Sequence, residues 1–152
     1  MAVGDNGTII TSPDGITWTS KSTFTSTILR GVSYLNNSFW TVSENGAGLI
    51  FTSSYGQNWD NRSASTTKRF YEITYGNNTY VAVGHPGGIF SSSDGSSWDN
   101  RSLEISSPLH GVVFGNSKFV AVGNNGKIVS SSDNGLSFDN ETSGTGDHLE
   151  GI

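Results

Sequence analysis

Residues 120–123 read Val-Ala-Val-Gly, and the same four residues stand at 81–84. Degenerate copies occur at 1–4, as Met-Ala-Val-Gly, and at 40–43, as Trp-Thr-Val-Ser. The copies recur with a period of about 40 residues, which is the length of one four-stranded unit in a radial β-repeat protein. The repetition therefore predicts four successive units with the same local structure.

A second phrase follows each copy and ends in an aromatic residue. We call these four segments, residues 12–18, 53–59, 92–98 and 131–138, the box loops. Three of them contain an Asp, and the second has Tyr55 in its place. The spacing from the closing aromatic residue to a landmark in the next unit is 13 residues in every copy, which supports a true repeat: Trp18 to Gly31, Trp59 to Glu72, Trp98 to Gly111 and Phe138 to Gly151.

Each unit divides into short strands separated by turn residues. In the last complete copy we expect an inner strand near 110–114, a second at 118–122, a third at 127–131 and an outer one at 136–140. The turn Gly115-Asn116-Ser117 has residues that tolerate positive φ. The segment Phe119-Val120-Ala121-Val122 is apolar on both faces, as expected for a sheet between two others. No segment has helical periodicity, so the chain is predicted to be all-β.

Composition and charge narrow the possible partners. The net charge is −5 and the eight Lys and Arg residues are not clustered. Such a chain offers no electrostatic surface for nucleic acid or for an anionic membrane. There is no Cys, and no stretch resembles a signal peptide or a membrane span. We expect no nucleic acid partner, no membrane insertion and no cofactor.

The box loops resemble the Asp-box, or bacterial neuraminidase repeat, of sialidases, some glycoside hydrolases and non-catalytic propellers such as photosystem II assembly factors. The resemblance covers nearly the whole chain and implies a β-propeller with four Asp-box blades, approximately at 1–30, 31–71, 72–110 and 111–152. It also implies that the box loops lie on the rim, opposite the usual binding face. Their expected role is structural: the Asp accepts backbone N–H groups, the Gly allows the turn, and the aromatic residue packs between blades. The residues concerned are Ser12, Asp14, Gly15 and Trp18; Ser53, Gly56 and Trp59; Ser92, Asp94, Gly95 and Trp98; and Ser131, Asp133, Gly135 and Phe138.

The units differ from one another at two places that a propeller would bring to one face, around the mouth of the central channel. One is the residue before the inner strand, and the other is the loop after the second strand. These residues are chemically diverse and would form a polar ring that recognises a glycan or a protein, unless they are unconstrained exposed loop residues. They are Arg30, Tyr71, His110 and Glu150, with Asp5, Asn6, Glu44, Asn45, His85, Asn124 and Asn125.

Trp40 also departs from the repeat, because its equivalents are Met1, Val81 and Val120. Core packing is the favoured interpretation, and an aromatic platform for a sugar is the alternative. His85, His110 and His148 lack metal-ligand spacing, so no metal site is expected. The four Arg residues do not form the cluster that the resemblance to sialidases would require, and no pair of carboxylates is singled out for glycoside hydrolysis. The sequence therefore predicts no catalytic residues.

Six Asn-x-Ser/Thr sequons form a further group of candidate sites. In a host that glycosylates secreted proteins they would shield the outer edges of the sheets. They are Asn6, Asn36, Asn61, Asn77, Asn100 and Asn140.

The seam between Ile152 and Met1 falls between the inner and second strands of a unit. We expect two chains to complete an eight-bladed ring, although a piece of a longer protein or a four-bladed ring would also fit. The favoured function is a non-catalytic binding or structural module of an extracellular, viral or cell-surface assembly. The alternatives are a sialidase-like glycoside hydrolase with a site completed across an oligomer, and a purely architectural half-propeller.

Overall fold

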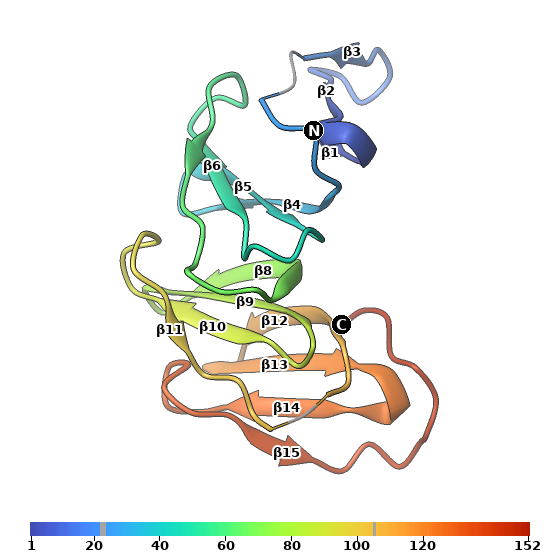
Figure 1. Ribbon diagram of the computed structural model, residues 1–152, viewed down its shortest axis with the longest axis vertical. Helices are drawn as coiled ribbons and strands as arrows, with labels where there is room; N and C mark the ends of the chain where they lie inside the picture. Colours follow the sequence, from blue (N-terminus) through green and yellow to red (C-terminus); the bar gives the residue numbers. More distant parts are fainter. Residues whose placement is uncertain (22–23, 105) are drawn as a thin grey trace.

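The computed structural model describes residues 1–152 apart from 22, 23 and 105. Four antiparallel sheets follow one another in chain order from the N-terminal to the C-terminal end (Figure 1). The first sheet contains β1 (Ala2–Val3), β2 (Ile9–Thr11) and β3 (Thr19–Ser20). The second contains β4 (Leu29–Leu35), β5 (Ser38–Ser43), β6 (Ile50–Ser53) and β7 (Asp60–Asn61). The third contains β8 (Arg69–Gly76), β9 (Thr79–His85), β10 (Ile89–Ser92) and β11 (Asp99–Asn100), and the fourth β12 (Leu109–Gly115), β13 (Lys118–Gly123), β14 (Ile128–Ser131) and β15 (Asp139–Glu141).

Each sheet is a meander in which every strand pairs with the next strand along the chain. The hairpin between the first two strands of each complete sheet turns through two residues with positive φ, such as Asn116 (φ 48°) and Ser117 (φ 60°). Asn tolerates this conformation, and paired positive-φ residues match the twist of a tight hairpin. The 3₁₀ turn η1 (Asp5–Gly7) joins β1 to β2 in the first sheet, and η2 (Asn124–Gly126) joins β13 to β14 in the fourth. The first complete inner strand, β4, begins two residues before the repeat-based blade boundary at 31.

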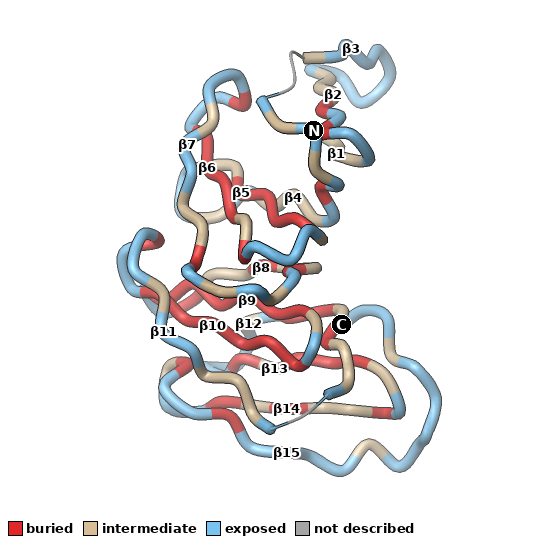
Figure 2. Tube along the Cα trace, in the orientation of Figure 1, coloured by how far each residue is buried: buried red, intermediate tan, exposed pale blue. Residues whose placement is uncertain are grey.

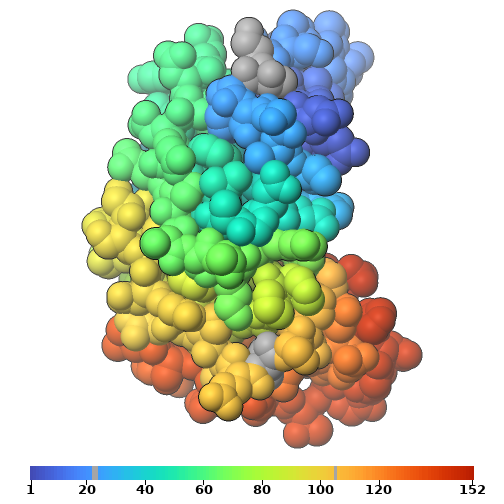
Figure 3. Space-filling model, viewed as in Figure 1, coloured from blue at the N-terminus to red at the C-terminus, as the bar shows by residue number. Residues whose placement is uncertain are grey.

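The core lies between the sheets. One cluster joins the first and second sheets through Ile9, Leu29 and Phe51, and the clusters between the later sheets include Phe70 with Ile73 and Leu109 with Phe119. Buried positions follow β5, β9, β10 and β13, whereas the outer strands are exposed (Figure 2). Each part of the chain packs against the next along the length of the molecule (Figure 3). The third sheet is accordingly covered on both faces, whereas Val120 in the terminal fourth sheet is only partly buried.

The outer strand of the fourth sheet is shorter than the sequence pattern indicated. β15 covers Asp139–Glu141, whereas the expected strand was 136–140. The Asp133 carboxylate accepts the backbone N–H groups of Leu136 (3.1 Å) and Ser137 (3.0 Å). These N–H groups are held in the box turn and cannot join a strand ladder, since a side-chain acceptor competes with the sheet.

Each later box loop also covers the second strand of the preceding sheet. A Cβ at Gly95 would lie 2.5 Å from Cη2 of Trp40 on β5, and a Cβ at Gly135 would lie 3.3 Å from Cγ2 of Val81 on β9. Gly56 approaches Met1 in the same way. The glycine of each of these loops therefore lets the loop close over its neighbour, and the contact repeats from sheet to sheet.

Candidate functional site

One pocket of about 350 Å³ is lined by Arg30, Tyr71, His110 and Glu150. Comparison of the repeats selected these same four residues as equivalent, but it placed them before the inner strands, whereas three of them lie within those strands. Arg30, Tyr71 and His110 lie on β4, β8 and β12, which are neighbouring inner strands, and Glu150 follows the fourth sheet. The pocket volume falls in the usual range for small ligand sites.

A β-bulge positions three of these side chains. In the pairing of β4 with β5 the register shifts between Leu29 and Gly31, so Arg30 is the extra residue. The register shifts in the same way around Tyr71 and around His110. A bulge re-aims the side chain of the inserted residue without interrupting the rest of the ladder. The repeated bulge explains how successive strands present a side chain to one pocket.

The centre of the pocket is a ring stack. The Tyr71 and His110 rings are nearly parallel, at 4°, with their centroids 5.4 Å apart. His110 Nε2 lies 2.7 Å from Oδ1 of Asn124, and Nδ1 lies 3.9 Å from Oε2 of Glu150. The hydrogen bond with Asn124 therefore orients the imidazole, while the Glu150 side chain beside it is 74% exposed. A flat surface beside an accessible carboxylate suits a ligand that carries a cation and an apolar face.

Arg30 and Glu44 form an ion pair at the other end of the pocket. Both Nε and a terminal nitrogen of Arg30 contact the same carboxylate oxygen of Glu44, whose side chain is 22% exposed. This contact offsets the positive charge of Arg30. The Arg30 side chain is still 52% exposed, but with its charge offset the exposed carboxylate of Glu150 makes the pocket negative overall.

The remaining channel-mouth candidates do not line this pocket. Glu44 and Asn124 support it by contacting Arg30 and His110. Asn125 donates its backbone N–H to Nδ1 of His148 (3.1 Å). His85 lies at the end of β9, and its Nδ1 has no hydrogen-bond partner among the described residues. Asp5 and Asn6 lie in η1, and Asn45 lies in the loop after β5.

Solved structures with a similar fold include the following three. YCF48 bound to D1 peptide has a TM-score of 0.68 at 18% identity, over 91% of this chain and 47% of that one. YCF48 from Cyanidioschyzon merolae has a TM-score of 0.68 at 16% identity, and the match covers 97% of this chain and 54% of that one. An ancestral GH74 enzyme has a TM-score of 0.66 at 16% identity, and the match covers 91% of this chain and 23% of that one. These structures are β-propellers.

The chain has a β-propeller fold. It spans about half or less of the length of these structures. No protein-family model matches the sequence, and no curated protein matches it. At these identities the likeness concerns the propeller fold alone.

Three of the four box loops of this propeller are built around a carboxylate. The backbone N–H groups of Thr17 and Ile16 and the Ser12 hydroxyl bind Asp14 and lower its pKa to about 2. Equivalent bonds from Ser97, Ser96 and Ser92 lower the pKa of Asp94 to about 2, and the hydroxyl and N–H of Ser137 help to depress that of Asp133 further. The box glycines Gly15, Gly56, Gly95 and Gly135 have φ between 69° and 78°. The other box residues are Ser53, Ser131, Trp18, Trp59, Trp98 and Phe138.

Two other groups of candidates lie elsewhere on the propeller. Trp40 is 4% exposed and packs in the core between the second and third sheets. The six sequon residues are all exposed, three of them on the outer strands β7, β11 and β15, and their glycosylation stays a prediction.

Over residues 1–152 without 22, 23 and 105, no group of His, Asp and Glu side chains has a metal-binding arrangement. Within that same part of the chain, no helix has the length and hydropathy that a bilayer span needs.

Proposed function

We propose that this chain is a non-catalytic propeller unit with Asp-box turns, and that it binds a protein segment at the pocket of Arg30, Tyr71, His110 and Glu150. The observation that carries this proposal is the repeated bulge, which turns equivalent residues of successive units into one pocket. The structure of YCF48 bound to D1 peptide supports a peptide ligand, because it has a similar fold.

The chemistry of the pocket indicates a segment with a Lys or Arg side chain. Glu150 is exposed and Arg30 is offset by Glu44, so the accessible charge is negative. The Tyr71 and His110 stack offers a π face against which a cationic side chain can lie. The overall charge of −5 also favours the approach of a basic segment.

Binding of a peptide can be measured after selection from a library of short random peptides. We expect the selected peptides to be basic, and we expect Tyr71→Ala or Glu150→Gln to weaken binding about tenfold in fluorescence polarisation, since a few central residues carry most binding energy. Tyr34→Ala is the matched control, because Tyr34 is an exposed Tyr on β4 that does not line the pocket. Equal affinity in Tyr71→Ala and Tyr34→Ala would remove the proposed site.

The absence of catalysis is part of the proposal. Glycoside hydrolysis needs two carboxylates that flank the scissile bond, one of them free to act as acid and the other as base or nucleophile. Glu44 is engaged by Arg30, and Glu150 lies beside His110. A panel of fluorogenic glycosides provides the test. Turnover that disappears in Glu44→Gln or Glu150→Gln would favour the hydrolase interpretation, for which the likeness to a GH74 enzyme is the supporting observation.

The proposal includes assembly of two chains into one ring. The box loops of the second, third and fourth sheets each cover the preceding sheet, whereas a Cβ at Gly15 in the first box loop would meet nothing within 4 Å. Among the described residues, β1 pairs with β2 alone. A second copy would supply the missing neighbour through the contact that already repeats within the chain.

A further inference from the structure

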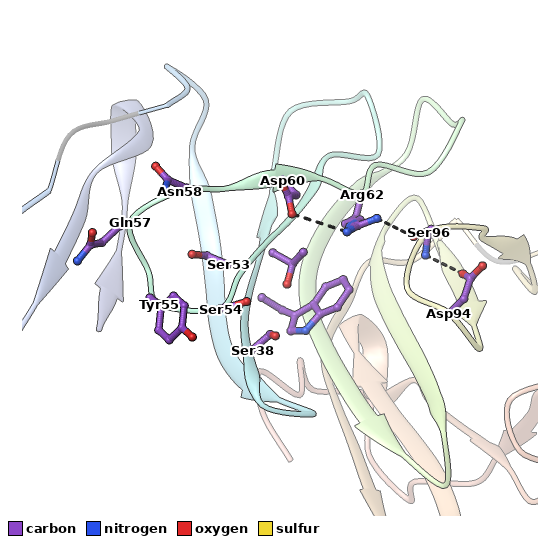
Figure 4. Close-up of a pocket in the computed structure, with 12 residues that line it drawn as sticks. Ser38, Ser53, Ser54, Tyr55, Gln57, Asn58, Asp60, Arg62, Asp94 and Ser96 are labelled. Carbon is purple, nitrogen blue, oxygen red and sulfur yellow. Dashed lines mark hydrogen bonds and ion pairs between the residues drawn. The ribbon is translucent and has the colours of Figure 1, made fainter.

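A second recess shares no lining residue with the pocket of Arg30, Tyr71, His110 and Glu150. We call it the rim groove, because the resemblance to Asp-box propellers implies that the loops beside it lie on the rim. This rim groove has a volume of about 510 Å³ and runs between the box loops of the second and third sheets (Figure 4). Tyr55, Gln57 and Asn58 project from the second loop, and Asp94 and Ser96 belong to the third (Figure 4). The other lining residues are Ser38, Trp40, Thr52, Ser53, Ser54, Asp60 and Arg62.

Two departures from the repeat meet at this groove. The second box loop has Tyr55 where the other loops have Asp, and the Tyr55 side chain is 86% exposed. Trp40 stands where the other units have Met1, Val81 and Val120. The Asp in the other loops satisfies two backbone N–H groups, so its replacement gives up a stabilising turn. An exposed aromatic ring is what the second loop has gained in its place.

Trp40 lines the groove, although its side chain is almost fully buried. Its indole packs against Tyr80 with ring centroids 4.5 Å apart and fits closely over Gly95. Its Nε1 is buried and has no hydrogen-bond partner among the described residues. Trp98, the box Trp of the third sheet, instead donates its Nε1–H to the Arg62 carbonyl (2.7 Å). A buried donor without an acceptor is unfavourable, and a ligand oxygen that reaches this N–H would satisfy it.

The charged groups in the groove are already paired with protein partners. Arg62 lies 3.7 Å from Asp60 and donates to the Ser96 hydroxyl (2.9 Å), and Ser96 donates its backbone N–H to Asp94 (2.7 Å), as the dashed lines in Figure 4 show. Two carboxylates against one guanidinium disfavour an anionic ligand. The rest of the lining consists of hydroxyl and amide groups, which both donate and accept hydrogen bonds.

We propose that the rim groove binds a neutral oligosaccharide, with Tyr55 stacking on a sugar ring and with the Trp40 indole and the surrounding hydroxyls and amides binding sugar oxygens. A sugar has an apolar C–H face for the aromatic ring and many hydroxyls for the polar lining. An apolar peptide would leave the lining hydroxyls and amides without partners, which is unfavourable. This site is independent of the channel-mouth pocket and of the protein segment proposed to bind there.

The four Trp indole N–H signals give a direct test by two-dimensional ¹H–¹⁵N NMR. Unbranched neutral hexose oligosaccharides, such as cellohexaose, maltohexaose and mannohexaose, are titrated separately into the full chain. We expect at least one of them to shift the Trp40 indole signal saturably, while the Trp18 signal in the first sheet stays fixed. Trp40→Phe identifies the signal by removing it.

Substitution of Tyr55 separates binding from folding. Tyr55→Ala is expected to weaken oligosaccharide binding about tenfold, and Tyr34→Ala to leave it unchanged. Tyr55→Asp is expected to weaken binding similarly and to raise the Tm by about 2–4 °C, because it restores an acceptor for the N–H groups of Gln57 and Asn58. A variant that is more stable and binds less cannot owe its loss of binding to misfolding.

Three outcomes would overturn the proposal. The first is that no oligosaccharide in the series shifts the Trp40 signal at millimolar concentration. The second is that Tyr55→Ala and Tyr34→Ala bind with the affinity of the wild type. The third is that the Trp40 signal responds to the basic peptide selected for the channel-mouth pocket and to no sugar.

Discussion

Folding lowers the pKa of some carboxyl groups in this protein and raises that of another. Asp14 and Asp94 accept backbone N–H groups on the surface, and these bonds lower the pKa of each to about 2. Glu72 on β8 instead has a raised pKa, chiefly because it is buried, although Ile73 N–H and the Ser33 hydroxyl donate to it. Burial disfavours the charged form, whereas hydrogen bonds to a carboxylate favour it. These residues therefore predict stability changes of opposite sign with pH.

Asp94 should stabilise the fold only where it is ionised. Its pKa is lower in the folded chain than in the unfolded chain, so its contribution is complete above pH 4 and is lost as the pH falls through about 2. We expect Asp94→Asn to have a lower Tm than the wild type at pH 6, and the gap to close as the pH approaches 2. Thermal melts followed by circular dichroism between pH 2 and 6 measure this. A gap that does not change with pH would contradict the assignment.

Glu72→Gln provides the comparison with opposite sign. The folded chain binds the Glu72 proton more tightly than the unfolded chain, so stability falls as the pH rises from the ordinary Glu value of 4.5 through the raised pKa. Gln keeps an oxygen that can accept from Ile73 and Ser33. We therefore expect Glu72→Gln to melt above the wild type at pH 7 and close to it at pH 4.

The sequence identified more of the residues than of their contacts. Arg30, Tyr71, His110 and Glu150 could be selected because a repeat makes equivalent positions comparable within one chain. The bulge that turns the first three toward one pocket could not be predicted, since a bulge depends on the pairing between two strands. Nor could the rim groove, which joins Tyr55 and Trp40 from different elements.

At the level of strands, lack of space for a side chain explains the Gly that ends the Val-Ala-Val-Gly phrase. Gly123 has φ −170°, an extended conformation that any residue adopts. A Cβ there would collide with the carbonyl oxygen of Pro108, just before β12, and Gly84 approaches the Arg69 carbonyl in the same way. The repeated Gly therefore allows the inner strand to pack closely against the end of the second strand.

Gly123→Ala should accordingly destabilise the protein by about 2–4 kcal/mol, because backbone cannot move aside as a flexible side chain can. Gly115→Ala is the matched control at the other end of the same hairpin, where a Cβ would meet nothing within 4 Å. We expect this control to remain within about 0.5 kcal/mol of the wild type. Urea denaturation midpoints for the two variants give the comparison. Similar losses in both would show that strand propensity, rather than space, sets the requirement.

For the whole molecule, the repeat period predicted the order of four sheets, but it could not show which sheet faces remain uncovered. That depends on contacts between units. Trp98 in the third box loop donates to the Arg62 carbonyl of the preceding sheet, whereas Trp18 in the first box loop is 46% exposed. Near it, Gly15 faces open space where Gly95 and Gly135 meet a neighbouring strand. The first box loop thus exposes the residues with which the later box loops pack against a neighbouring sheet.

If a second copy covers this face, the mass in solution should be about twice 16.1 kDa. Light scattering across a range of protein concentrations measures it. Trp18→Asp should restore the mass of a single chain, because it places a charge in the contact. Leu136→Asp is the matched control, since Leu136 is an exposed apolar residue of the fourth box loop, whose Gly135 already packs on Val81. A single-chain mass for the wild type at every concentration would assign the uncovered face to further blades of a longer chain.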